Sequence, residues 1–166
     1  MITIRKHTRD DIPYRVKRLN NSQVTKFLGD DHAKGTTFKK QKEWFDAYEK
    51  NKEKQFFTIC DNKKPIGFMG LSNIDKKNQN ADLFLAIWED EYRGKGNGKL
   101  AIQRLIEYAF KKLKLHKIKL WVTEDNIPAV KLYQSVGFEI EGKQEDEEFS
   151  NGKRYTNILM AIFNKE

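Results

Sequence analysis

Residues 91–100 read Glu-Tyr-Arg-Gly-Lys-Gly-Asn-Gly-Lys-Leu, and they join an apolar run at 83–88 to an amphipathic run at 100–113. The change of period predicts a strand that enters a helix through a glycine-rich loop. Glycines at three alternate positions free the backbone to take positive φ and let amide N–H groups converge on one point. The helix adds its unpaired N–H groups and the positive end of its dipole. We therefore expect the loop to hold phosphate.

Basic side chains surround the same point. Arg93, Lys95 and Lys99 supply full positive charges around a site that the backbone already shapes for an anion. A pyrophosphate is the ligand that this arrangement suits.

Two familiar phosphate-binding loops do not match the stretch. A P-loop places glycine at position 93 and Ser or Thr at position 100, where this chain has Arg93 and Leu100. A Rossmann fingerprint that starts at Gly94 needs its third glycine at position 99, which is Lys99. It also belongs to the first βα unit of a domain, whereas here more than half of the chain comes before the loop.

The remaining pattern, Arg93-x-x-Gly96-x-Gly98, resembles the acetyl-CoA signature of the GNAT superfamily of N-acetyltransferases. A second pattern matches the other signature of that family at its usual spacing, and it reads Asn126-x-x-Ala129-x-x-Leu132-Tyr133-x-x-x-Gly137-Phe138. Within the family, the C-terminal half is most similar to the spermidine acetyltransferases and the ribosomal-protein N-terminal acetyltransferases. The stretches that carry this likeness are 91–96, 137–142 and 151–160.

Composition limits the class of protein. A chain of 166 residues with 38% hydrophobic residues suits one domain, 1–166. No apolar run is long enough to span a bilayer, and no signal peptide is seen. The single cysteine, Cys60, is expected to be buried in a reduced, cytoplasmic protein. The net charge of +8 invites nucleic acid, but no such motif is present, so a solvated basic face is the preferred interpretation.

The order of elements predicts an α+β (α/β) fold of the GNAT type, with a mixed central sheet of about seven strands and about four helices. Strand, helix and strand over 81–88, 97–113 and 118–123 imply a parallel pair. By resemblance, this pair splays apart at the acetyl-CoA site. The other expected elements are a strand at 2–6, a helix ending near Leu19, a short segment at 23–28, a helix capped by Thr37, strands at 56–60 and 65–74, a helix at 126–136, and a hairpin of 138–149 and 154–163 with Asn151-Gly152 at its tip.

Amide formation requires a thioester held against a neutral amine, a donor for the carbonyl oxygen, and a proton for the departing thiolate. The resemblance implies that the pantetheine arm lies along 85–88 and that a backbone N–H near Ile87 or Trp88 polarises the carbonyl. It also implies that Tyr133 protonates the sulfur. Asn126 is expected to cap its helix and to contact the coenzyme. The coenzyme contacts implied in full are Ile87, Trp88, Arg93, Gly94, Lys95, Gly96, Asn97, Gly98, Lys99 and Asn126.

The general base is less well marked. Asp82 is a carboxylate inside an apolar strand, at a place where related acetyltransferases often carry Glu. Three acids at the strand end are rivals, and they are Glu89, Asp90 and Glu91. The three histidines are expected to be structural or solvated, and they are His7, His32 and His116.

The acceptor amine stays open at this point. Four acids in the closing hairpin would attract a polyamine, and they are Glu145, Asp146, Glu147 and Glu148. The facing N-terminal region has mixed charge, which suits a peptide N-terminus or an amino sugar, and its charged residues are Asp30, Asp31, Lys34, Lys39, Lys40 and Lys42. The partners expected are acetyl-CoA and such an amine, with no metal and no membrane, and a homodimer is compatible with the chain. The alternative from another class is a non-catalytic module that binds coenzyme A or nucleic acid.

Overall fold

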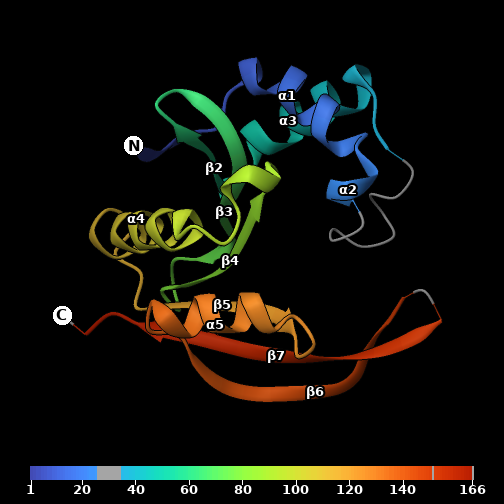
Figure 1. The fold of residues 1–166 in the computed structure, drawn as a ribbon. Helices are drawn as coiled ribbons and strands as arrows, with labels where there is room; N and C mark the ends of the chain where they lie inside the picture. The colour runs from blue at the N-terminus through green and yellow to red at the C-terminus, as the bar shows by residue number, and fades with distance from the viewer. Residues whose placement is uncertain (26–34, 151, 166) are drawn as a thin grey trace.

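A computed structural model describes residues 1–25, 35–150 and 152–165 of the chain. It contains one seven-stranded sheet in the order β1-β2-β3-β4-β5-β7-β6 (Figure 1). The strands are β1 (Ile2–Lys6), β2 (Gln55–Asp61), β3 (Lys64–Asp75), β4 (Asn80–Ile87), β5 (Lys117–Thr123), β6 (Glu139–Ser150) and β7 (Lys153–Phe163). The helices are α1 (Ile12–Leu19), α2 (Ser22–Thr25), α3 (Phe38–Lys50), α4 (Asn97–Lys111) and α5 (Ile127–Ser135). The predicted mixed sheet is confirmed.

The sheet is antiparallel except between β4 and β5, which run parallel. Helix α4 is the crossover between these two strands, as the order of elements predicted. The two strands of the closing hairpin enter the sheet in reverse order: β7 pairs with β5, and β6 becomes the edge strand. This arrangement lets the apolar β7 fill the sheet interior and leaves the highly charged β6 in solvent.

Two apolar clusters hold helices against opposite faces of the sheet. One joins α4 and α5 to β4, β5 and β7 through residues such as Ile102, Leu105, Ile118 and Met160. The other joins the N-terminal helices to β2, β3 and β4, and its members include Leu19, Val24, Phe56, Phe68 and Trp88. Helix α3 packs against this second cluster through the partly buried rings of Trp44 and Tyr48.

Helix starts follow the predicted caps. The Thr37 side chain accepts a hydrogen bond from the Lys40 amide at 3.2 Å, and Pro13 lies in the first turn of α1. Two apolar side chains on these helices remain in solvent, because Leu100 is 49% exposed and Phe38 is 52% exposed. Each lies in the first turn of its helix, where the chain has only just left the loop and has not yet met the sheet.

Part of the predicted segment 23–28 and several charged residues lie outside the described residues. These are Asp30, Asp31, His32 and Lys34, together with the hairpin residue Asn151. The other half of the predicted turn, Gly152, has a φ of 75° between β6 and β7. No helix in the described part of the chain is long and apolar enough to span a membrane.

Candidate functional site

The two parallel strands separate soon after they meet. Their pairing covers only Asn80–Asp82 of β4 and Lys117–Lys119 of β5. Beyond this point β4 continues to Ile87 and β5 to Thr123 without pairing to each other. The predicted splay is therefore present, and it opens toward the glycine loop and the start of α5.

A cleft of about 570 Å³ occupies this opening. Its walls are the end of β4, the glycine loop and the first turns of α5, with one residue from α2. The lining residues are Val24, Leu85, Ala86, Ile87, Trp88, Tyr92, Arg93, Gly94, Gly96, Gly98, Lys99, Asn126, Pro128, Ala129 and Leu132. Most of the sequence-predicted coenzyme residues thus lie around one space.

The glycine loop has the backbone that an anion site needs. Gly94 and Gly96 have φ values of 68° and 80°, and Gly96 is the N-cap of α4. The first helical hydrogen bond runs from the Leu100 N–H to the Gly96 carbonyl at 3.2 Å, so the N–H groups before it remain available at the helix start. These features fit a pyrophosphate.

The third glycine serves a different purpose from the one predicted. Gly98 does not have a positive φ. A Cβ at this position would lie 3.2 Å from Leu132 and 3.4 Å from Leu85, two residues that line the cleft. The expectation that all three glycines adopt positive φ is therefore wrong, and Gly98 instead lets the helix approach α5 and β4 closely.

The charged residues of the loop are not equivalent. Arg93 donates from Nε to the Ile87 carbonyl at 2.9 Å and also pairs with Asp90, so it ties the loop to the end of β4. Lys99 lines the cleft, whereas Lys95 and Asn97 do not. The Asn97 side chain donates to the Tyr92 carbonyl at 2.9 Å and thus stabilises the loop.

The end of β4 is bent by a bulge-like pair of hydrogen bonds. The Trp88 and Glu89 amides both donate to the Ile66 carbonyl, at 2.9 and 3.3 Å. Since successive N–H groups along a strand point to opposite edges, the Ile87 amide points away from β3 and toward the opening. Of the two backbone donors that the resemblance allowed, the Trp88 amide is already engaged, which leaves the Ile87 amide.

The second motif forms the far wall of the cleft. Asn126 accepts a hydrogen bond from the Ala129 amide at 3.3 Å and caps α5, as predicted. Tyr133 lies one turn beyond Ala129, is buried behind the cleft rather than lining it, and has its ring 5.7 Å from that of Phe138. Burial raises the pKa of Tyr133 to about 12. No described residue hydrogen bonds to its hydroxyl.

Asp82 does not line the cleft. It accepts a hydrogen bond from Asn73 Nδ2 at 2.7 Å and lies 3.6 Å from Lys119 Nζ, while its buried Oδ1 has no hydrogen-bond partner in the described part of the chain. Five residues of extended strand separate it from Ile87, which is about 16 Å. Asp82 marks the last paired rung before the strands part.

The rival acids are all engaged. Glu89 pairs with Arg18, Asp90 pairs with Arg93, and Glu91 pairs with Lys64 at 2.8 Å. The described histidines are placed as expected, outside the cleft. His7 is buried against Phe68 and bonds Thr58 at 2.8 Å, and His116 packs on Phe163.

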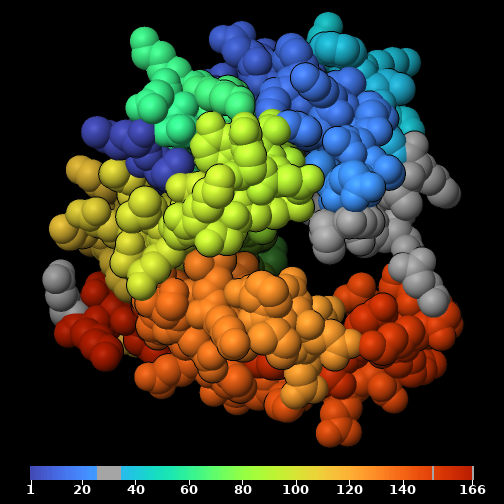
Figure 2. Space-filling view, viewed as in Figure 1, coloured from blue at the N-terminus to red at the C-terminus, as the bar shows by residue number. Residues whose placement is uncertain are grey.

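The four hairpin acids also lie outside the cleft. They form an irregular part of β6, between Gln144 and Glu148, where Asp146 has a φ of 53°. Within the described residues none of the four makes an ion pair, whereas the nearby Lys143 and Lys153 pair with Glu124 and Asp125. Figure 2 shows an open gap between the N-terminal helices, in blue, and this hairpin, in red.

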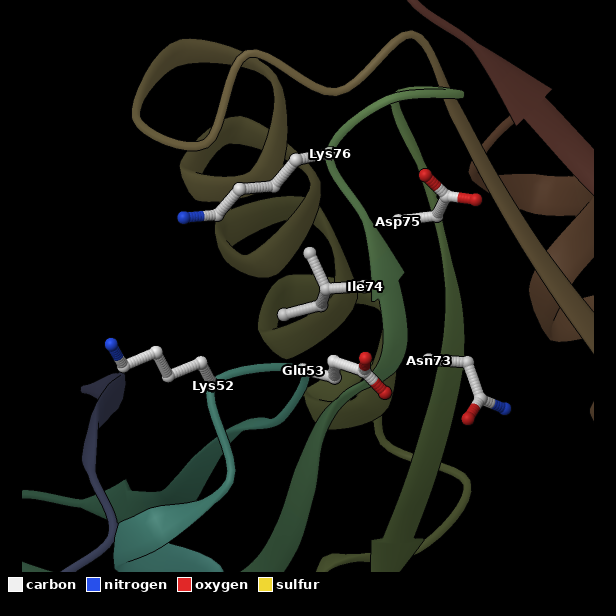
Figure 3. A pocket seen from close by; sticks show the side chains of 6 residues that line it. All are labelled: Lys52, Glu53, Asn73, Ile74, Asp75 and Lys76. Carbon is white, nitrogen blue, oxygen red and sulfur yellow. The ribbon is translucent and has the colours of Figure 1, made fainter.

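A second hollow, of about 500 Å³, lies beside the far end of β3 and the loop before β2. Figure 3 shows that its side chains do not converge, because Lys52, Ile74 and Lys76 lie on the α4 side and Asn73 and Asp75 lie on the other. Asp75 is moreover bonded to Asn78. No group of acids, cysteines and histidines in the described ranges could hold a metal ion.

Comparison with known proteins gives consistent results. Residues 21–138 match the family model described as Acetyltransferase (GNAT) family. The chain is 30% identical to spermidine N(1)-acetyltransferase of Escherichia coli K12, over 98% of this chain and 86% of that protein. The same enzyme of Vibrio cholerae is 32% identical, over 95% and 89%.

Solved structures of the Vibrio cholerae enzyme are similar throughout. Its complex with CoA and spermine superposes with a TM-score of 0.88 at 29% identity, over 98% of this chain and 95% of that one. A dodecameric form of the enzyme gives a TM-score of 0.83 at 29% identity, over 98% and 93%.

Proposed function

Because the chain belongs to the acetyltransferase (GNAT) family and is an acetyl-CoA-dependent N-acetyltransferase, we propose that its acceptor is a polyamine such as spermidine. The opening between β4 and β5, with a phosphate-type loop at its mouth, supports the binding of acetyl-CoA, and the similarity to spermidine acetyltransferases carries the choice of acceptor. The spermidine acetyltransferase relatives favour a polyamine over a protein N-terminus, which the sequence had left as an equal. They also favour an enzyme over a non-catalytic binding module.

Each wall of the cleft supplies one requirement of the reaction. The helix start at Gly96 and the side chain of Lys99 hold the pyrophosphate, and the amide groups along β4 receive the pantetheine arm. The Ile87 amide donates to the thioester oxygen as that oxygen gains charge. Lys95, Asn97 and Asn126 remain proposed coenzyme contacts at the rim, although the first two do not line the cleft.

In the proposed reaction the amine nitrogen attacks the thioester carbon directly, in a ternary complex. A C–N bond forms, the C–S bond breaks, and the thiolate takes a proton from Tyr133, which recovers it from solvent. The phenol of Tyr133 is protonated at neutral pH, and burial, which raises its pKa to about 12, makes it a weaker acid than an exposed tyrosine. The ammonium must lose its proton first, and Asp82 is proposed to take it through water, because the carboxylate is too distant for direct contact.

The hairpin acids are proposed to attract the distal ammonium groups of the acceptor. Glu145, Asp146, Glu147 and Glu148 are exposed and make no ion pairs among the described residues. They belong to the hairpin that faces the N-terminal helices across the gap in Figure 2. Two like-charged ends of a polyamine can then be held while the third nitrogen reaches the cleft.

Further proposals concern the whole chain. Residues 1–166 are proposed to act as one acetyltransferase domain, since all strands belong to one sheet. The buried free thiol of Cys60 supports a reducing cytoplasm. The dodecameric relative supports an oligomer, of which the homodimer is the smallest form.

An amine panel with free-thiol release tests the acceptor. Spermidine, spermine, a peptide with N-terminal Ala or Ser, an amino sugar and kanamycin are each supplied with saturating acetyl-CoA. We expect spermidine or spermine to give the highest kcat/KM. A peptide or sugar that exceeds both polyamines would overturn the polyamine assignment, and no thiol release with any amine would overturn the enzyme.

A further inference from the structure

Helix α1 is joined to the end of β4 by a small polar cluster. The Arg18 guanidinium pairs with one carboxylate oxygen of Glu89, and the Tyr14 hydroxyl donates to the other at 3.2 Å. The side chains of Arg18 and Glu89 are each only 15% exposed. This is therefore a sheltered contact between two elements that are far apart in the sequence.

Aromatic rings continue the contact toward the cleft. The Tyr14 ring lies 5.6 Å from the ring of Trp88, which precedes Glu89 and lines the cleft. The Arg18 guanidinium lies 5.8 Å from the Tyr14 ring. Helix α1 leads into α2, where Val24 also lines the cleft. The polar cluster thus fixes one wall of the opening, made by α1 and α2, against the bent end of β4.

The contact is not easily replaced. Arg18 Nε is buried without a hydrogen-bond partner in the described part of the chain, so loss of Glu89 would leave the guanidinium unpaired. A sheltered charge that loses its partner is strongly unfavourable, unlike a charge in an exposed pair. We expect α1 to shift or loosen in response.

We infer that Tyr14, Arg18 and Glu89 are positioning residues that set the acceptor side of the cleft, an inference that rests on the proposed function. Both oxygens of Glu89 are engaged by residues of α1, so we assign its carboxylate to positioning. The glycine loop is held by its own contacts, through Arg93 and Asn97, on another side of the cleft. Loss of the cluster should therefore weaken acceptor use and leave coenzyme binding intact.

The test compares Arg18→Met, Glu89→Gln and the double variant, with the amine that the wild-type enzyme acetylates fastest. We expect each single change to raise the acceptor KM about tenfold or more. The acetyl-CoA Kd, from calorimetry, should stay within about threefold. The acceptor KM of the double variant should not exceed that of the more impaired single variant, because the two residues act as one pair. Arg18→Lys, which keeps the charge, should recover most of the loss.

The matched control is Glu107→Gln, which removes an exposed ion pair with Lys111 on α4 and should leave both constants unchanged. An acceptor KM within threefold of wild type in all variants would overturn the inference. The inference would also be overturned if the fall of kcat at low pH disappeared in Glu89→Gln but not in Arg18→Met, because Glu89 would then be the general base.

Hydrogen exchange supplies a measurement that needs no acceptor. Amides of α1 should exchange about tenfold faster in Arg18→Met, while those of α4 keep their rates. Unchanged α1 exchange would overturn the cluster as a structural contact. If the wild-type protein acetylates no amine, the proposed function fails, and the cluster is then judged by exchange alone.

Discussion

Tyr133→Phe removes a single hydroxyl from α5, the helix whose first turns form the wall of the cleft opposite β4. The phenol has a pKa of about 12 because it is buried, whereas an ordinary thiol has a pKa of about 8.5. Full proton transfer to a thiolate would then be uphill by about 5 kcal/mol. The hydroxyl therefore acts first as a hydrogen-bond donor while the sulfur gains charge, and the uphill proton transfer is completed when Tyr133 recovers a proton from solvent.

The expected loss of rate follows from that role. A hydrogen bond to a charged group contributes about 1.5–3 kcal/mol, so kcat should fall by roughly tenfold to a few hundredfold. The acetyl-CoA Kd should change by less than about threefold, because the bond is strong only as the thiolate forms. Stability should change little, since no described residue hydrogen bonds to this hydroxyl.

Free-thiol release gives kcat, calorimetry gives the acetyl-CoA Kd, and thermal unfolding gives stability. Tyr108→Phe is the control, because its hydroxyl bonds Gln55 at 3.4 Å and lies outside the cleft. An unchanged kcat in Tyr133→Phe would refute the reasoning and assign the proton to water. A large rise in the acetyl-CoA Kd would show instead that Tyr133 serves coenzyme binding.

Four more predictions follow from the site. Gly98→Val should raise the acetyl-CoA Kd about tenfold or more, because the valine side chain would push Leu132 and Leu85 into the cleft. Gly96→Ala should instead act through backbone strain of about 1–2 kcal/mol, because Gly96 has a positive φ and open space around it. A wild-type Kd in both variants would contradict these roles. Asp82→Asn should lower kcat at neutral pH and recover as pH rises and the free amine becomes abundant; a pH-independent loss would point to a structural role instead. The double change Glu147→Gln, Glu148→Gln should raise the spermidine KM severalfold and leave a neutral amine unaffected; an unchanged KM would make the acids a solvated face. The unfolding free energy should fall as pH rises from about 10 toward 12, because burial raises the pKa of Tyr133 and Tyr14 above the value in the unfolded chain. Tyr133→Phe should make this fall smaller in alkaline denaturation curves.

The local sequence determined the elements and the anion loop. Gly96 at the start of α4, Thr37 and Asn126 at their helix starts, and the alternating strands act over a few residues, where backbone preference and capping decide the outcome. The spacing of two motifs then identified the family. The splay of β4 from β5 was predicted from that family likeness, since no residue pattern in either strand indicates where their pairing stops.

Only the tertiary structure decided which groups face the cleft. The Trp88 amide is engaged because Ile66, on another strand, presents its carbonyl there, and Glu89 is engaged because α1 brings Arg18 to it. Leu85 and Leu132 give Gly98 its role, although they come from different elements. Each of these contacts joins residues distant in the chain, so its geometry depends on how the sheet and the helices pack and cannot be read from a local pattern.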